Sequence, residues 1–219
     1  MTTNTLNSPT IIGLLNRLFD ESEASESALE VVAQSDASHL ITSKTGYRQF
    51  YGLLKDIPIP VSRETGYLLY MLARSTRAHS VLEFGTSFGV STIYLAAALR
   101  DNGGGRIITT EFEPSKAARA RENLKEADLL DLVEVREGDA LETLARDLPR
   151  TFDLVLLDGA KGLYADILHS VEAHLRPGSL VLADDARHCA EFVSHMRASA
   201  DRYVSVPLAG DLEMSMRLC

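Results

Sequence analysis

The sequence predicts an α/β fold with a seven-stranded, mostly parallel sheet, helices on both faces and a helical extension at the N-terminus. Short apolar stretches alternate with helical patterns five times between residues 80 and 198, which is typical of a parallel sheet covered on both faces. The first stretch, Ser80–Phe84, runs through a glycine-containing turn into an apolar helix. Two final strands are separated by only three residues, Ala209–Asp211, and so short a connection favours an antiparallel C-terminal hairpin.

Residues 1–60 are expected to form the helical extension. Ser8 and Pro9 are the start signal of a helix with an apolar face. The acidic, serine-rich stretch 20–26 predicts a solvated turn, and a second helix is expected over 27–34. Residues 35–60 are less regular, and Pro58 and Pro60 exclude a helix interior or a central strand there. We interpret 35–60 as a lid-like segment, and an ordinary surface connector is the alternative.

Residues 61–219 are expected to carry the sheet. Ser62 is predicted to cap a helix with apolar residues on one face. Parallel strands are predicted at 80–84, 106–111, 132–136, 152–157 and 179–183, the last delivered by a turn at 176–178. Helices are predicted after them at 91–100, 115–127, 140–148, 163–175 and 187–198. The closing strands, 203–207 and 212–218, distinguish this Rossmann-like arrangement from a plain dinucleotide fold, which ends in a parallel strand.

Composition disfavours several classes of function. The 219 residues have a formal net charge of -9, which disfavours nucleic acid or an anionic membrane surface as a partner. Two cysteines, Cys189 and Cys219, make no disulfide framework. We see no signal peptide and no apolar run approaching the roughly 18–20 residues of a membrane span. A cytoplasmic enzyme or binding protein is therefore expected.

Acidic residues lie at the ends of all five predicted parallel strands: Glu83, Glu111, Asp139, Asp158 and the pair Asp184-Asp185. Ligands of open α/β sheets bind outside the C-terminal ends of the strands. A single carboxylate there is readily explained as a helix N-cap. Acids at every strand end are harder to explain by capping, so we expect a ligand site at this edge.

The turn and Glu111 indicate which ligand this is. A carboxylate at the end of the second strand can accept both hydroxyls of a ribose. The turn reads G-x-x-x-G from Gly85 to Gly89 and lacks the G-x-G-x-x-G spacing that brings a pyrophosphate onto a helix end. Glu83, just before the turn, would repel a pyrophosphate and tolerate a cation. S-adenosylmethionine, with a sulfonium, an amine and a ribose, fits this edge better than NAD does.

The run Glu83–Thr92 resembles the first motif of class I methyltransferases. More closely, the chain resembles the metal-dependent O-methyltransferases typified by catechol and caffeoyl-coenzyme A O-methyltransferases, from about residue 60 to about residue 185. The motifs that carry the resemblance are 83-EFGTSFGVST-92, 110-TEFEP-114, 137-EGDAL-141, 152-FDLVLLDGAKGLY-164 and 182-LADD-185. The resemblance implies an S-adenosylmethionine-dependent O-methyltransferase domain over 61–219, with 1–60 as its extension and lid.

By this resemblance, particular residues bind the cofactor. The methionine part would be surrounded by Glu83, Gly85, Thr86 and Ser91. Glu111 would hold the ribose, and Asp139 and Ala140 would border the adenine. Asp158, at the end of the fourth parallel strand, is expected to touch the cofactor as well.

Asp158, Asp184 and Asp185 form a second group at adjacent strand ends. Carboxylates and waters are the ligands that Mg²⁺ prefers, and a bound ion would lower the pKa of an attacking hydroxyl. In the family, the positions matching these three residues bind the metal, and the position matching Lys161 is the general base. Lys161 would need a pKa depressed by burial and a nearby cation. The family usually has Asn at the position of Asp185.

The sequence thus predicts methyl transfer from S-adenosylmethionine to a hydroxyl of a small molecule, with phenols and catechols as candidates, assisted by Mg²⁺ or a similar ion. The rivals are a metal-independent methyltransferase acting on another oxygen or nitrogen, a nicotinamide-dependent oxidoreductase, and a non-catalytic nucleoside-binding module. We interpret Tyr47, Phe50 and Tyr51 as an aromatic helix face that packs on a core or a partner, with covering an aromatic substrate as the alternative. The apolar faces of the N-terminal helices predict a homodimer.

Overall fold

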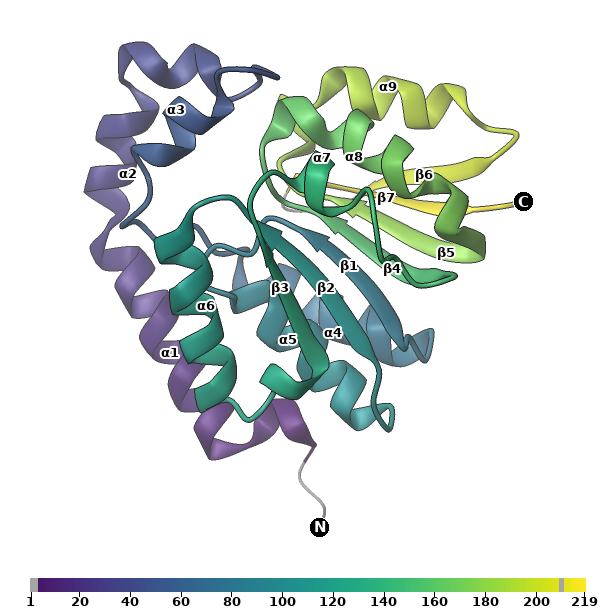
Figure 1. Ribbon diagram of the computed structural model, residues 1–219, viewed down its shortest axis with the longest axis horizontal. Coiled ribbons are helices and arrows are strands. Elements are labelled where there is room, and N and C mark those ends of the chain that lie inside the picture. The colour runs from purple at the N-terminus through teal and green to yellow at the C-terminus, as the bar shows by residue number, and fades with distance from the viewer. Residues whose placement is uncertain (1–3, 209–210) are drawn as a thin grey trace.

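The computed structural model describes residues 4–208 and 211–219, and in these ranges it contains one seven-stranded sheet in the order β3-β2-β1-β4-β5-β7-β6 (Figure 1). The strands are β1 Ser80–Phe84, β2 Arg106–Glu111, β3 Val133–Glu137, β4 Phe152–Leu157, β5 Leu175–Ala183, β6 Tyr203–Leu208 and β7 Leu212–Arg217. Neighbouring strands from β3 to β5 pair in parallel. β7 runs antiparallel to both β5 and β6. The predicted mixed sheet and closing hairpin are confirmed; residues 209 and 210 of its turn lie outside the described residues.

Alternate side chains of the central strands enter two separate apolar clusters, one on each face of the sheet. In β4, Leu154 and Leu156 join one cluster, whereas Val155 and Leu157 join the other. Because side chains alternate along a strand, strands buried on both faces must be apolar throughout. This is why the predicted bounds of β1, β2 and β4 coincide with those observed.

Helices cover both faces of the sheet. On one face lie α4 Arg63–Ser75, α5 Val90–Asp101 and α6 Pro114–Glu126, with the N-terminal helix α1 Pro9–Ala24 packed outside them. On the other lie α7 Ala140–Thr143, α8 Tyr164–Val171 and α9 Ala190–Ala198. None of the described helices is long and apolar enough to span a bilayer.

The N-terminal extension contains α1, α2 Glu26–Ala33 and α3 Tyr47–Gly52. Ser8 caps α1 as expected, its hydroxyl accepting from the Ile11 N–H. The predicted solvated turn over 20–26 is wrong, because α1 continues to Ala24. The helix is held there by an ion pair between Glu21 and Arg119 of α6.

The apolar face of α1 is buried against the chain's own core, which removes one reason for expecting a partner subunit. Leu14 and Leu18 are almost fully buried in the same cluster as the core of α5. Nothing in the described chain tests the homodimer, which stays a prediction.

Four predicted elements of the second half differ from those observed by more than one residue. The helix expected over 163–175 is α8, which ends at Val171 and is followed by a 3₁₀ turn to His174. The helix expected over 140–148 ends at Thr143. The Arg136 guanidinium donates hydrogen bonds to the carbonyl oxygens of Thr143, Arg146 and Asp147, so these oxygens do not continue the helix. The predicted turn at 176–178 is the irregular first half of β5. The last helix begins at Ala190, after a short 3₁₀ turn.

Candidate functional site

The glycine turn after β1 is held against the end of the neighbouring strand β2. The N–H groups of Gly85 and Thr86 both donate to the carbonyl oxygen of Thr110, at 3.2 and 3.1 Å. Gly85 has a φ of +101°, and a Cβ there would lie 2.6 Å from the Asp158 carbonyl oxygen. Only glycine allows this backbone to sit so close to the end of β4, so the turn brings β1, β2 and β4 together at one place.

Glu83 lies beneath this turn. Its carboxylate is fully buried and accepts hydrogen bonds from the hydroxyls of Ser91, Thr92 and Thr109. Because the Thr109 hydroxyl donates to Glu83, the Thr86 hydroxyl must be the donor in the 2.6 Å contact between the two threonines. Burial raises the pKa of Glu83 above its usual value. The carboxylate therefore braces the turn and the start of α5 from below.

Glu111, at the end of β2, stands at the edge of a cavity with both oxygens oriented. One accepts from the Ser87 N–H at 2.9 Å and the other from the Glu113 N–H at 3.0 Å. Burial raises the pKa of the carboxyl, and these N–H groups and Lys116 oppose that rise. A carboxylate has about four acceptor positions, so Glu111 can still receive two hydroxyls from a ligand.

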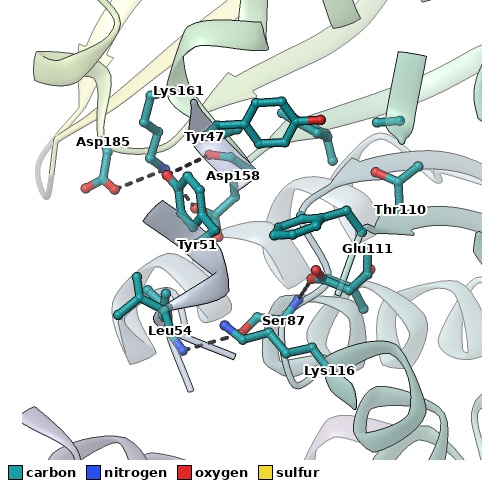
Figure 2. A pocket seen from close by; sticks show the side chains of 18 of the residues that line it. Tyr47, Tyr51, Leu54, Ser87, Thr110, Glu111, Lys116, Asp158, Lys161 and Asp185 are labelled. Atoms are coloured by element: carbon teal, nitrogen blue, oxygen red, sulfur yellow. Dashed lines mark hydrogen bonds and ion pairs between the residues drawn. The ribbon is translucent and has the colours of Figure 1, made fainter. Parts of the chain in front are cut away.

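The cavity, of about 290 Å³, runs along the C-terminal ends of the strands from Gly138 and Ala140 past Glu111 to Asp158 and Lys161 (Figure 2). The predicted cofactor residues Gly85, Thr86 and Ser91 line it as well. The Thr110 hydroxyl faces this region and has no partner among the described residues. A buried hydroxyl without a partner is costly, and a bound ligand would satisfy it.

The N-terminal extension forms the outer wall of the cavity, with Leu29, Ala33, Ile41, Tyr47, Phe50, Tyr51, Leu54 and residues 58–60. This supports the interpretation of residues 35–60 as a lid. Both readings of the aromatic face hold for Tyr47, which packs edge-on against Phe112 and also lines the cavity. The Tyr51 hydroxyl lies over the end of β4, 3.5 Å from the carbonyl oxygen of Gly159.

Asp139 attaches the lid to the sheet edge. Its carboxylate caps α7, accepting from the Leu141 N–H at 2.9 Å, and pairs with Arg48 of α3 at 2.6 Å. Ala140, the next residue along the chain, lines the cavity. The structure thus brings Asp139 to the predicted adenine end, where its carboxylate faces the lid.

Lys161 is the centre of the other end of the cavity. Its ammonium lies 3.3 Å from Asp158 Oδ1 and 3.0 Å from Asp185 Oδ2. It also donates to the Tyr164 hydroxyl at 2.9 Å, which in turn donates to the Asp184 carbonyl oxygen at 3.0 Å. The lysine side chain is only 5% exposed. Asp158, Asp184 and Asp185 follow the ends of β4 and β5, as the strand-end argument predicted, whereas Lys161 and Tyr164 come from the 3₁₀ turn and the helix start after β4.

The depressed pKa that Lys161 would need as a general base is not found among the described residues. Burial lowers the pKa of Lys161, but the Tyr164 hydroxyl and the carboxylates of Asp158 and Asp185 outweigh it, and the pKa lies well above its usual value. Burial is also the main influence on Asp158, and it raises the pKa of that carboxyl to about 8. Lys161 therefore holds its proton, and Asp158 takes up a proton more readily than an exposed carboxylate does.

The three aspartates do not form the predicted metal site. Among residues 4–208 and 211–219, no group of three or more His, Cys, Asp or Glu side chains is arranged to hold a metal ion. Asp158 and Asp185 instead share the Lys161 ammonium, and the Asp185 backbone adopts a left-handed conformation, φ +53°. A divalent ion between these carboxylates would meet the ammonium directly, so the arrangement does not fit Mg²⁺.

The arrangement does fit S-adenosylmethionine. The carboxyl groups of Glu111, Asp158 and Asp185 line the cavity together with Lys116 and Lys161, and their oxygens can accept hydrogen bonds from the amine and the hydroxyls of this cofactor. Glu111 retains acceptor capacity for a ribose, and the Thr110 hydroxyl lacks a partner in the described chain. Reasoning from the sequence gave no role to Ser87, Thr110, Lys116 and Tyr164, although all of them except Lys116 lie within the motifs that carry the family resemblance.

Comparison with known proteins agrees with this geometry. Residues 82–186 match a family described as a methyltransferase domain. A catechol O-methyltransferase of Niastella koreensis is 37% identical over 130 residues, and one of Mycobacterium tuberculosis is 38% identical over 127. Each match covers 58% of this chain and spans only 58% and 57%, respectively, of the relative's own length.

Solved structures match over most of the chain. An O-methyltransferase from Bacillus cereus in complex with S-adenosylhomocysteine has a TM-score of 0.68 at 23% identity, covering 91% of this chain and 99% of its own. TomG from Streptomyces achromogenes, an O-methyltransferase involved in tomaymycin synthesis, was solved with S-adenosylmethionine; its TM-score is 0.66 at 26% identity, with the same coverage. The predicted Rossmann-like methyltransferase fold and the resemblance to S-adenosylmethionine-dependent O-methyltransferases are confirmed.

Proposed function

We propose that this chain is an S-adenosylmethionine-dependent O-methyltransferase that acts on a small hydroxylated molecule. The observation that carries the proposal is a single cavity that joins a ribose-accepting carboxylate, Glu111, to a buried carboxylate–ammonium pair, Asp158 and Lys161. The likeness to catechol O-methyltransferases supports a phenolic acceptor. The apolar and aromatic lid residues, Tyr47 and Tyr51 among them, suit an aromatic ring as well.

The cofactor end holds and orients its ligand with few groups. Glu111 accepts the ribose hydroxyls, and the Ser87 and Glu113 N–H groups keep its two oxygens in place. The turn from Gly85 approaches the ligand with its backbone, while Glu83 braces it through three hydroxyls. Glu83 therefore positions the turn that binds the cofactor, whereas the sequence suggested that Glu83 itself contacts the cofactor.

The acceptor end activates the hydroxyl. S-adenosylmethionine supplies an electrophilic methyl group on a sulfonium. Asp158 takes the proton from the acceptor hydroxyl, because its burial makes it a stronger base than an exposed carboxylate. Lys161 holds a positive charge beside the oxygen as negative charge develops there. The lid residues exclude water and align the acceptor, and alignment contributes much of the rate in a direct displacement.

The predicted assistance by Mg²⁺ is not part of this proposal. Lys161 contacts both Asp158 and Asp185 and supplies a positive charge at this end of the cavity. We therefore expect methyl transfer to continue after treatment with a chelator. Activity lost with EDTA and restored by Mg²⁺ would reinstate the three aspartates as metal ligands.

The test is transfer of a labelled methyl group. The chain is incubated with methyl-labelled S-adenosylmethionine and a panel of catechols and other phenols, with and without EDTA, and label in the organic product is measured. We expect labelled ether from at least one phenol, and a loss of about 10²–10⁴-fold in Asp158→Asn, the range for a general base. Lys125→Met, at an exposed position of α6, is the control. No labelled ether from any phenol, or an undiminished rate in Asp158→Asn, would contradict the mechanism.

A further inference from the structure

Lys116 is a buried cation on the cavity wall that the mechanism does not use. It is the third residue of α6 and is only 5% exposed. Within residues 4–208 and 211–219 its ammonium has no hydrogen bond and no ion pair shorter than 4 Å, and it lies 5.9 Å from the centre of the Phe88 ring. The stem of Lys116 is therefore buried while its ammonium lies on the cavity wall without a fixed partner, so it can act on the charged groups around it.

Other cations of α6 are paired within the chain. Arg119 pairs with Glu21 at 3.0 Å, and Arg121 pairs with Glu137 at 3.2 Å. Lys116 instead extends past Ser87, below Glu111, into the cofactor end of the cavity (Figure 2). The side chain is therefore aimed at the site and not at the surface.

Lys116 and Glu111 are two buried groups of opposite charge in the same wall. Burial lowers the pKa of Lys116, and the carboxylates of Glu111, Glu113 and Asp56 oppose that fall. Burial raises the pKa of Glu111, and Lys116 is the cation that opposes the rise, whereas Glu113 adds to it. Glu83, beneath the turn, is a further negative group near Glu111. Lys116 is thus the positive charge that favours an ionised Glu111.

We propose that Lys116 is a positioning residue for the cofactor: its ammonium keeps Glu111 in the carboxylate form that accepts the two ribose hydroxyls. The proposal rests on the proposed function for the identity of the ligand. A protonated Glu111 would present one O–H donor in place of acceptor positions, and it would also lose its charge-assisted bonds to the ribose.

The test is the pH dependence of S-adenosylhomocysteine binding, measured by calorimetry from pH 5.5 to 8.5. Removing an opposite charge within a few ångströms moves a carboxyl pKa by about 1–3 units. We expect Lys116→Met to bind about tenfold more weakly than wild type at pH 6, with the difference closing towards pH 8.5. Lys116→Arg should keep the wild-type profile, and Lys125→Met, on the exposed side of the same helix, should not change it.

A purely structural role would weaken binding equally at every pH, and that result, or an unchanged profile in Lys116→Met, would overturn the proposal. Thermal unfolding without ligand shows whether Lys116→Met folds; should it not fold, Lys116→Gln replaces it. In a Glu111→Gln background, Lys116→Met should cause no pH-dependent loss of S-adenosylhomocysteine affinity. A pH-dependent loss that persists in this background would also overturn the proposal. Wild-type protein that binds no S-adenosylhomocysteine at any pH would instead defeat the proposed function.

Discussion

Replacing Gly85 with alanine tests the geometry that brings three strands to the cofactor site. Gly85 has a φ of +101°, and a Cβ would lie 2.6 Å from the carbonyl oxygen of Asp158 and 2.8 Å from the Cα of Gly159. The left-handed backbone alone costs an L-residue about 1–2 kcal/mol. The clash is with backbone, which no side-chain rotation relieves, and overpacking of this kind costs about 1–3 kcal/mol more. We therefore expect Gly85→Ala to lose about 2–5 kcal/mol of unfolding free energy.

Gly103→Ala is the matched control for this substitution. Gly103 has a similar φ of +97°, but nothing lies within 4 Å of its Cβ position. It should lose only the backbone part, about 1–2 kcal/mol, and leave ligand binding unchanged. Urea unfolding gives the free energies, and equilibrium dialysis with labelled S-adenosylmethionine gives the affinities. Equal destabilisation of the two variants, or full binding by Gly85→Ala, would refute the argument that the turn is held against β4.

Three further predictions concern charged groups. Glu111→Gln should weaken S-adenosylhomocysteine binding by about 1.5–3 kcal/mol, the value of a hydrogen bond to a charged group. The control is Glu137→Gln, because Glu137 pairs with Glu111 in the sheet register but is exposed on β3; it should not change the binding. Equal losses of affinity in the two variants, measured by calorimetry, would contradict the role of Glu111. Lys161→Met should lower the turnover of labelled methyl groups at least tenfold while leaving S-adenosylhomocysteine affinity within about threefold; a loss confined to affinity would contradict its role. Burial raises the pKa of Asp153, but N–H groups at the start of β1 and an arginine outweigh it and lower the pKa overall. The ionised Asp153 therefore stabilises the fold above about pH 3.9, and this stabilisation is lost as the pH falls through the pKa of the folded state. Asp153→Asn should be less stable than wild type by about 1–3 kcal/mol at pH 7 and equally stable in strong acid, as measured by urea unfolding. A difference that persists in acid would contradict the ionic role of Asp153.

The sheet was largely predictable because its signals are local. Continuous apolar runs mark β1, β2 and β4 and give their bounds without error. The element ends that depend on distant groups were not predictable. The helix beginning at Ala140 stops early because Arg136, on β3, takes the carbonyl oxygens that a longer helix would use.

The candidate site was predictable as a set of strand ends but not as a set of roles. Glu83 was expected to face the ligand, yet its carboxylate is occupied by the hydroxyls of Ser91, Thr92 and Thr109, and the last of these is on another strand. The pKa of Lys161 depends on where Asp185 and Tyr164 lie in space. Sequence spacing does not reveal such contacts.

The burial of Lys116 was not predictable from the sequence either. A lysine in the first turn of a polar helix is typical of a solvated surface position, and nothing in its neighbourhood along the chain indicates burial. Its burial follows from the way α6 packs beside β2 and the turn after β1, which is a property of the assembled fold.

The central claim is that the cavity beside Glu111 and Asp158 binds S-adenosylmethionine. The most direct test is calorimetric titration of the wild-type chain with S-adenosylhomocysteine and, in parallel, with NAD. We predict one S-adenosylhomocysteine bound per chain and no heat of binding for NAD. Binding of NAD without binding of S-adenosylhomocysteine would contradict the claim.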